Sequence, residues 1–299
     1  MTQPIHLQNE HLQVGVLPQT GASLAYLRVW NKGNWQDVLR PTPSDQYDNP
    51  SATSSFLMLP WVNRIRDGKF TFEGVEYQLE VTKDDGTARH GDVRKRPWEV
   101  MSSDEMRCLL TVDSRDFDDV NFPFVFSAQE EVTLKENQLI VTVTLTNEDS
   151  RPMPCGFGHH PYFVSLPDDP PSVQIPCSHY WVLDERLMPT GEIFPVDNHL
   201  DFRNGREVNG EYNDILTQLT HDNIVIVYLN TGTRVQMNME YAKHYLLFTP
   251  KGEDSVAIEP MTLVTDGFNL PLPSDTTGLW VLQSGESKSS QLVIDVGSA

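Results

Sequence analysis

The stretch Gln138–Asp149, QLIVTVTLTNED, alternates apolar and polar residues over most of its length. Val141, Val143 and Leu145 fall on one side of an extended chain, and the threonines between them fall on the other. This period of two is typical of a half-buried antiparallel strand. The preceding stretch, FSAQEEVTLKEN, has the same character and ends in Lys135-Glu136-Asn137, which favours a turn. The two stretches together predict a β-hairpin.

Strand patterns recur along the rest of the chain, and turn dipeptides such as Asp67-Gly68 and Asn204-Gly205 separate them. No segment of helical length has an apolar stripe, although NDILTQLTH (213–221) is compatible with one or two helical turns. We therefore expect an all-β chain, residues 1–299, folded as one domain of two large antiparallel sheets packed face to face. Polar side chains on an open concave face would then line a cleft. The further predicted strands are MRCLLTVDS, VEYQLEVTK, NIVIVYLNTG, TRVQMNM, HYLLFTP, SVAIEP, LWVLQS and SQLVIDV.

The charge balance limits the partners of this chain. Its 299 residues include 22 Lys and Arg against 42 Asp and Glu, which gives a net charge of −20. Such a balance argues against nucleic acid and anionic membranes as partners, and it is compatible with a protein that handles neutral small molecules. The three cysteines lack a CxxC spacing and favour a reduced, cytoplasmic setting. No signal peptide and no apolar run of membrane-spanning length is evident. The sequence does not indicate an oligomeric state.

Two polar clusters lie in the first third of the chain. In PWVNRIRDGKF, Asn63 and Arg64 follow an apolar run, and Arg64 would offer a fork of donors to paired hydroxyls in a cleft. In RHGDVRKRPWEV, His90 precedes a glycine, and Trp98 begins a new strand. An aromatic ring can cover the apolar face of a sugar, but Trp98 as a core residue is an equally simple interpretation.

Two further clusters carry acid–base groups. In GFGHHPYF, adjacent residues of an extended segment point to opposite faces, so His159 and His160 are not expected to serve one centre. This weakens the case for a metal site, and we expect neither a metal nor a cofactor. In VAIEP, Glu259 ends an apolar run, where a carboxylate is costly unless it has a partner or a task.

These four stretches, in this order and at this spacing, resemble the aldose 1-epimerases (the galactose mutarotase-like family), and the resemblance covers roughly residues 10–297. It implies a β-supersandwich in which His160 acts as general acid and Glu259 as general base. Arg64 and His90 would bind substrate, and Asp214 is the nearest match to an aspartate that grips sugar hydroxyls. Many members have Asn where this chain has His159, which leaves the preferred sugar open.

The residues suit the reaction that the resemblance implies. Mutarotation removes a proton from the C1 hydroxyl and delivers one to the ring oxygen, and a carboxylate beside a protonated imidazole meets both needs. The expectation is an isomerase of a neutral aldohexose such as glucose or galactose. A phosphorylated or sulfonated sugar is the alternative within the family, since Arg66, Arg94, Lys95 and Arg96 lie near the motifs. A non-catalytic carbohydrate-binding protein, a glycoside hydrolase and a metal-dependent cupin are alternatives of other classes.

Overall fold

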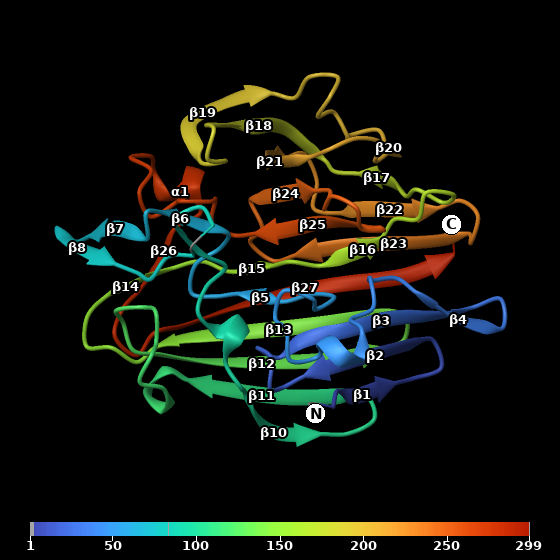
Figure 1. Ribbon diagram of the computed structural model, residues 1–299, viewed down its shortest axis with the longest axis horizontal. Coiled ribbons are helices and arrows are strands. Elements are labelled where there is room, and N and C mark those ends of the chain that lie inside the picture. The colour runs from blue at the N-terminus through green and yellow to red at the C-terminus, as the bar shows by residue number, and fades with distance from the viewer. Residues whose placement is uncertain (1–2, 83, 299) are drawn as a thin grey trace.

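The computed structural model describes residues 3–82 and 84–298, and it confirms the all-β prediction (Figure 1). The largest sheet has nine strands, with the predicted hairpin near its middle. Val141, Val143 and Leu145 are buried, as their alternation predicted. In sheet order the strands are β10 (Glu99–Ser103), β11 (Arg107–Asp113), β12 (Phe126–Lys135), β13 (Gln138–Asn147), β27 (Ser287–Ser298), β23 (Thr233–Met239), β22 (Ile224–Tyr228), β17 (Ser172–Gln174) and β20 (Arg206–Glu207).

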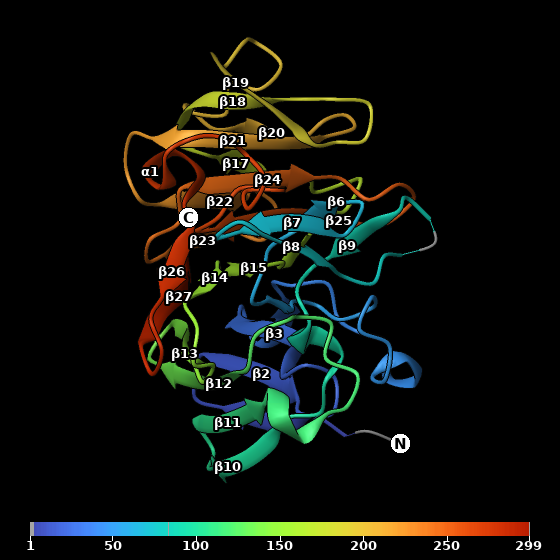
Figure 2. The ribbon, with the colours of Figure 1, turned by 90° about the vertical axis from the view of Figure 1, so that its left-hand side faces the viewer.

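Two sheets lie on the other side of the core (Figure 2). The four-stranded sheet consists of β1 (Ile5–Gln8), β2 (Leu12–Leu17), β3 (Ser23–Asn31) and β4 (Asn34–Asp37). The eight-stranded sheet runs in the order β19 (Pro189–Pro195), β18 (Cys177–Leu183), β21 (Asn213–Leu219), β24 (His244–Phe248), β25 (Ser255–Met261), β15 (Gly158–His159) and β5 (Leu57–Met58), with β16 (Tyr162–Val164) also paired to β25. Single bridges, Leu24 to Ser55 and Leu39 to Phe163, join the two sheets into one layer.

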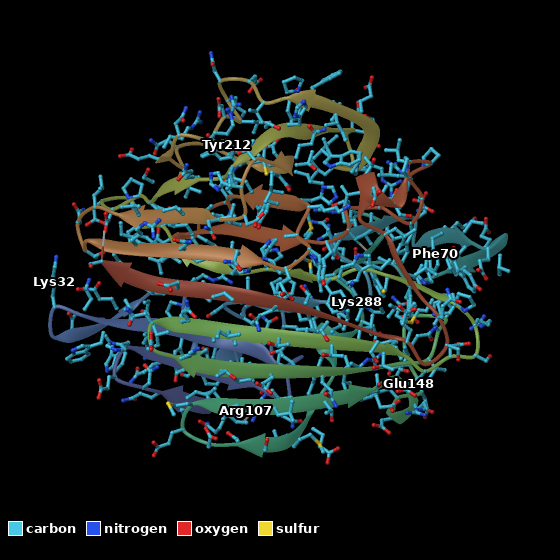
Figure 3. All side chains as sticks on the ribbon, turned by 180° about the vertical axis from the view of Figure 1, so that it is seen from behind. Lys32, Phe70, Arg107, Glu148, Tyr212 and Lys288 are labelled. Atoms are coloured by element: carbon cyan, nitrogen blue, oxygen red, sulfur yellow. The ribbon has the colours of Figure 1, made fainter. Side chains whose placement is uncertain are left out.

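The apolar faces of the two layers form one continuous core. Seen from behind in Figure 3, the nine-stranded sheet crosses the width of the molecule, and its inward side chains, such as Leu139 and Ile294, belong to the same buried cluster as Leu27 and Leu247 of the opposing layer. Burying such a face of alternating apolar residues is the main stabilising term in a sandwich of this kind.

Three two-stranded ribbons and a few short turns complete the described chain. The ribbons are β6 (Arg64–Arg66) with β9 (Thr87–Arg89), β7 (Lys69–Phe72) with β8 (Val75–Gln78), and β14 (Met153–Cys155) with β26 (Trp280–Leu282). The helical elements are α1 (Ser274–Thr277) and 3-10 turns at Ser44–Gln46, Val93–Lys95 and Ser114–Asp116. No helix within residues 3–82 and 84–298 has the length and apolarity to cross a membrane.

The prediction of helical turns at 213–221 was wrong. Asn213–Leu219 is strand β21, held between β18 and β24 in the middle of the eight-stranded sheet. Ile215 and Thr217 are β-branched and fit this half-buried position better than a helix. Pairing on both sides decided the conformation, and this information is absent from the local sequence.

Candidate active site

The register of the eight-stranded sheet gathers polar residues on its outer face. Leu246 lies opposite Glu259, and Phe248 lies opposite both Asn213 and Ala257. Cross-strand partners share a face. Leu246, Phe248, Asn213 and Glu259 all line one cavity of about 430 Å³, a size suited to a small ligand. The central strands of the sheet therefore form the floor of a polar pocket.

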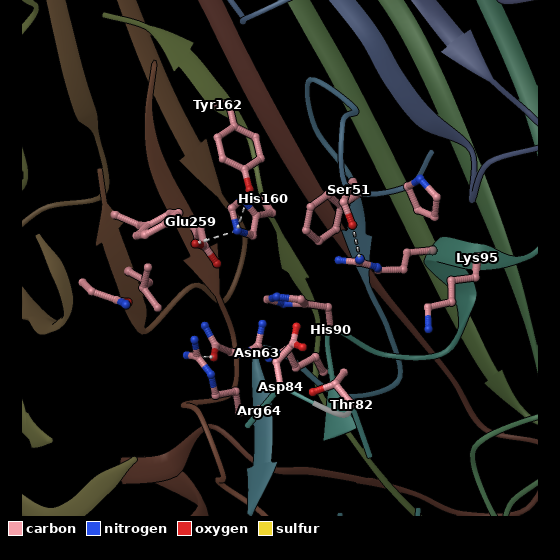
Figure 4. Close-up of a pocket in the computed structure, with 17 residues that line it drawn as sticks. Ser51, Asn63, Arg64, Thr82, Asp84, His90, Lys95, His160, Tyr162 and Glu259 are labelled. Atoms are coloured by element: carbon pink, nitrogen blue, oxygen red, sulfur yellow. Dashed lines mark hydrogen bonds and ion pairs between the residues drawn. The ribbon is translucent and has the colours of Figure 1, made fainter. Parts of the chain in front are cut away.

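Glu259 and His160 form the central pair of this pocket (Figure 4). Glu259 Oε1 lies 2.9 Å from His160 Nε2, and the two side chains are 1% and 5% exposed. Glu259 sits in β25, a strand whose every residue is buried, while the His160 N–H donates to the Phe56 carbonyl at 2.9 Å. The second carboxylate oxygen, Oε2, and the second ring nitrogen, Nδ1, are buried without a hydrogen-bond partner among the described residues. Unsatisfied buried polar atoms of this kind are costly, so they suit a site that binds a polar ligand.

Aromatic rings fix the orientation of His160. The ring of Tyr162 stacks on it at 4.5 Å between centroids, and the ring of Phe56 lies at 4.6 Å. The Tyr162 hydroxyl is also 3.5 Å from His160 Nε2. His90 meets the imidazole edge-on at 5.5 Å. The imidazole is therefore held by packing, with the edge that carries Nε2 directed at the carboxylate.

A left-handed turn places His90 in the pocket. Both His90 (φ 60°) and Gly91 (φ 71°) adopt positive φ, and a Cβ at Gly91 would lie 2.2 Å from the Leu59 carbonyl oxygen. Only glycine avoids that clash, which explains the His-Gly pair. Burial, with nearby positive charges including Arg94, lowers the pKa of His90 well below its ordinary value. His90 is therefore a neutral donor or acceptor at neutral pH.

Asn63 and Arg64 enter the pocket from the start of β6. Asn63 Oδ1 accepts from Arg64 Nη1 at 2.9 Å, and Arg64 Nε lies 3.4 Å from Asp85 Oδ2 without hydrogen-bond geometry. Burial, followed by repulsion from Arg89, lowers the pKa of Arg64, while Asp85 and Glu259 oppose this shift. Arg64 thus presents a partly unsatisfied guanidinium to the cavity.

Five of the seven residues singled out from the sequence line this cavity: Asn63, Arg64, His90, His160 and Glu259. The adjacent histidines separate as predicted, because His160 lines the cavity while His159 is buried outside it.

The other two residues lie elsewhere. Trp98 is 2% exposed within the hydrophobic core and donates from Nε1 to the Val93 carbonyl at 3.4 Å. Asp214 lies opposite Leu247, whose side chain belongs to the core, and its Oδ2 accepts from the Asn213 N–H. A shift of one residue along a strand changes the face. Asn213 therefore takes the place in the pocket that was expected of Asp214.

Several pocket residues were not assigned roles from the sequence. Tyr162 is two residues after His160, and this spacing alone would have placed both side chains on one face of an extended segment. Phe56, Ser51 and Arg89 come from segments whose approach to β25 depends on the tertiary fold. Within the described ranges, no three His, Cys, Asp or Glu side chains form a group suited to a metal ion.

Comparison with known proteins shows which family this chain resembles in sequence. The aldose 1-epimerase family model matches residues 3–295. The uncharacterized protein YphB of Escherichia coli K12 is 28% identical over 176 residues, which are 57% of this chain and 57% of that protein. Human galactose mutarotase is 29% identical over 144 residues, which are 45% of this chain and 40% of the human protein.

Solved structures with the same fold cover nearly the whole chain. A galactose mutarotase-like protein from Clostridium acetobutylicum superposes with a TM-score of 0.88 at 22% identity, over 98% of this chain and 95% of that one. An aldose epimerase homologue from C. elegans has a TM-score of 0.86 at 20% identity, over 100% of both chains. At these identities the structural likeness establishes the fold, and the family model establishes the kinship. The chain belongs to the aldose 1-epimerase family.

Proposed function

We propose that this protein is a cofactor-independent mutarotase, which interconverts the α- and β-anomers of a reducing aldopyranose. The observation that carries the proposal is the buried contact of 2.9 Å between Glu259 Oε1 and His160 Nε2 in a polar pocket. The hemiacetal oxygen O1 and the ring oxygen O5 are bonded to one carbon, so one proton acceptor and one proton donor must lie close together to reach both. This pair meets that requirement.

During ring opening, Glu259 accepts a proton and His160 donates one. The Glu259 carboxylate takes the proton from the C1 hydroxyl, and a carbonyl forms at C1 as the C1–O5 bond breaks. The electron pair goes to O5, which receives a proton from the His160 imidazolium. Each such transfer contributes about 10²–10⁴-fold in rate. The bound substrate replaces the direct contact between Glu259 and His160, so that its O1 hydroxyl forms a hydrogen bond with Glu259 and its O5 atom forms one with His160.

Ring closure reverses these roles. Rotation about the C1–C2 bond presents the other face of the carbonyl to O5. The neutral His160 takes the proton from the O5 hydroxyl as O5 attacks C1, and Glu259 returns its proton to O1. No proton is gained or lost over the cycle, so the enzyme regains its starting charge state without help from solvent.

The surrounding residues hold the remaining hydroxyls. Arg64, Asn63 and the neutral His90 offer hydrogen bonds along one wall, and Asn213 offers its amide from the floor. The apolar faces of Phe56 and Phe248 border the same cavity. A mixture of donors and apolar surface suits a pyranose, which has both kinds of face.

The test compares anomer interconversion by the wild type and two variants. Polarimetry on freshly dissolved α-D-glucose or α-D-galactose should show acceleration by the wild type. His160→Ala and Glu259→Gln should each lower kcat/KM about 10²–10⁴-fold with little change in melting temperature. The double variant should be no worse than the slower single variant, because the two groups act on one proton cycle. Wild-type rates in either folded variant would contradict the proposed roles.

A non-catalytic sugar-binding protein is the main alternative of another class. Such a protein would bind sugar, as measured by calorimetry, but would not change the rate of anomer exchange. The buried acid–base pair disfavours it, because a pure binding site gains nothing from a carboxylate and an imidazole held in direct contact.

A further inference from the structure

The pocket carries more positive charge than the proposed proton transfer requires. The described residues that line it include Arg64, Arg89, Arg94 and Lys95, against the acidic Asp84 and Glu259. The chain as a whole has nearly twice as many acidic as basic residues. The pocket is therefore locally basic, whereas the protein as a whole is acidic.

Arg94 differs from most arginines of the described chain. Within residues 3–82 and 84–298, eleven arginines form an ion pair with a carboxylate, whereas Arg94, Arg206 and Arg234 do not. Of these three, only Arg94 lines the pocket. Its Nε is buried without a hydrogen-bond partner, its Nη2 donates to Ser51 Oγ at 3.2 Å, and its Cζ lies 4.6 Å from the centre of the Phe56 ring. A half-buried guanidinium that pairs with no carboxylate suits an anionic ligand.

The neighbouring basic residues are already neutralised. Arg66 pairs with Asp184 at 2.7 Å, and Arg96 pairs with Asp92 at 2.9 Å. Arg66 and Arg96 are therefore unavailable to a ligand. The sequence alone did not distinguish them from Arg94 and Lys95 as candidate anion-binding residues. Lys95 lies exposed at the rim, on the same side of the pocket as Ser51 and away from Glu259 and Arg64 (Figure 4). Arg94, Lys95 and Ser51 together form one donor cluster, which we term the cationic end of the pocket.

The order of contacts relates the cationic end to the reacting atoms. Glu259 touches His160, the His160 ring lies 4.6 Å from the Phe56 ring, and Phe56 packs under the Arg94 guanidinium. In a pyranose the covalent path runs from O1 through C1, O5 and C5 to the exocyclic C6. A substrate with O1 at Glu259 and O5 at His160 can extend C6 along this row of contacts, toward Phe56 and Arg94. The ring hydroxyls on C2 and C3 then face away from this end.

We propose that the substrate is an aldopyranose with an anionic group on C6, and that Arg94, Lys95 and Ser51 bind this group. The inference rests on the proposed function, since it places the anomeric carbon at Glu259 and His160. Phosphate ester, sulfonate and carboxylate share the required chemistry. The net charge of −20 does not oppose an anionic substrate, because surface charges are screened beyond about 8 Å at physiological ionic strength.

Mutarotation of four sugars tests the proposal. The probes are glucose, glucose 6-phosphate, glucuronate and 6-deoxyglucose-6-sulfonate, each followed by exchange of the anomeric signals in NMR. We expect kcat/KM for at least one anionic sugar to exceed that for glucose by about ten- to a hundredfold, and the best of the three identifies the anion. A higher kcat/KM for glucose than for all three would overturn the subsite and leave the mutarotase proposal standing.

Two substitutions assign the effect to residues. Arg94→Gln should reduce the preference for the anionic sugar over glucose by about ten- to a hundredfold, mainly through KM. Arg234→Gln, which removes an arginine of β23 that also lacks a carboxylate partner but lies outside the pocket, should leave the preference as it is. An unchanged preference in Arg94→Gln would refute the assignment.

A binding measurement separates failure of the subsite from failure of the catalytic proposal. If no sugar is interconverted faster than in buffer, the mutarotase proposal fails. At least one of the three anionic sugars should still raise the melting temperature of the wild type and of Arg234→Gln, but not of Arg94→Gln. Equal stabilisation of the two variants, or stabilisation of neither, would overturn the cationic end by itself.

Discussion

Replacement of His159 by Asn should make the protein less sensitive to acid without loss of activity. His159 is buried next to His160 in the chain but lies outside the pocket, and burial lowers its pKa from 6.5 to about 4. Between these two values the unfolded chain binds a proton at this position and the folded chain does not. Stability must therefore fall as the pH falls below about 6.5.

The size of the effect follows from the two pKa values. The pKa of His159 is 6.5 in the unfolded chain and about 4 in the folded chain. At pH 5 the unfolded chain therefore binds a proton that the folded chain does not, and this lowers the free energy of unfolding by about 2 kcal/mol relative to pH 7.5. Asparagine does not titrate, so this loss disappears in the variant. His90 and His244, whose pKa values burial also lowers, are present in both proteins and cancel from the difference.

Urea unfolding at pH 7.5 and pH 5.0 measures this difference. The free energy of unfolding should drop by about 2 kcal/mol more in the wild type than in His159→Asn. The variant should keep the wild-type kcat, in contrast to His160→Ala. An equal drop in both proteins would show that His159 titrates normally, and a large loss of kcat in the variant would show that the two histidines are not functionally separate.

Further substitutions test the positions in and around the pocket. Asn213→Ala should raise KM for the sugar about three- to tenfold, while Asp214→Asn should change KM less, as initial rates against sugar concentration would show; the reverse ranking would contradict the strand register. Trp98→Phe should lower the free energy of unfolding by about 1–3 kcal/mol and leave KM within about twofold, because Trp98 is a core residue. Tyr162→Leu should lower kcat more than Tyr162→Phe, since only the former removes the ring that stacks on His160; equal rates in the two variants would exclude positioning by the ring.

Much of the fold was predictable because β-strands carry their burial pattern in the sequence. The hairpin of β12 and β13 follows from strict alternation and a turn at Lys135-Glu136-Asn137, where Glu136 adopts a positive φ of 52°. The strand β21 was missed because its short, mixed pattern is decided by its neighbours on both sides. Local sequence does not reveal that a segment will be central in a sheet.

The types of residue in the candidate site were predictable from the sequence, but the faces of the strands on which their side chains lie were not. Glu259 was noted as a carboxylate at the end of an apolar run, the resemblance to the aldose 1-epimerases singled out His160, and the two side chains lie in contact. Asp214 and Trp98 were placed in the cleft by residue type, yet the side of the strand or core that a residue occupies depends on register and packing. The cationic end could not be predicted for another reason. The sequence does not distinguish among the four basic residues Arg66, Arg94, Lys95 and Arg96, and only the structure shows that Arg66 and Arg96 pair with carboxylates.

The most direct test of the central claim is the rate of anomer exchange itself. A freshly dissolved pure α-anomer, glucose or glucose 6-phosphate, is followed by polarimetry near neutral pH with wild-type protein, with Glu259→Gln and with buffer alone. The proposed mechanism predicts that the wild type speeds the approach to equilibrium in proportion to its concentration and that Glu259→Gln is close to buffer. A folded wild-type protein that leaves the rates of both sugars unchanged, or a Glu259→Gln variant as fast as the wild type, would contradict it.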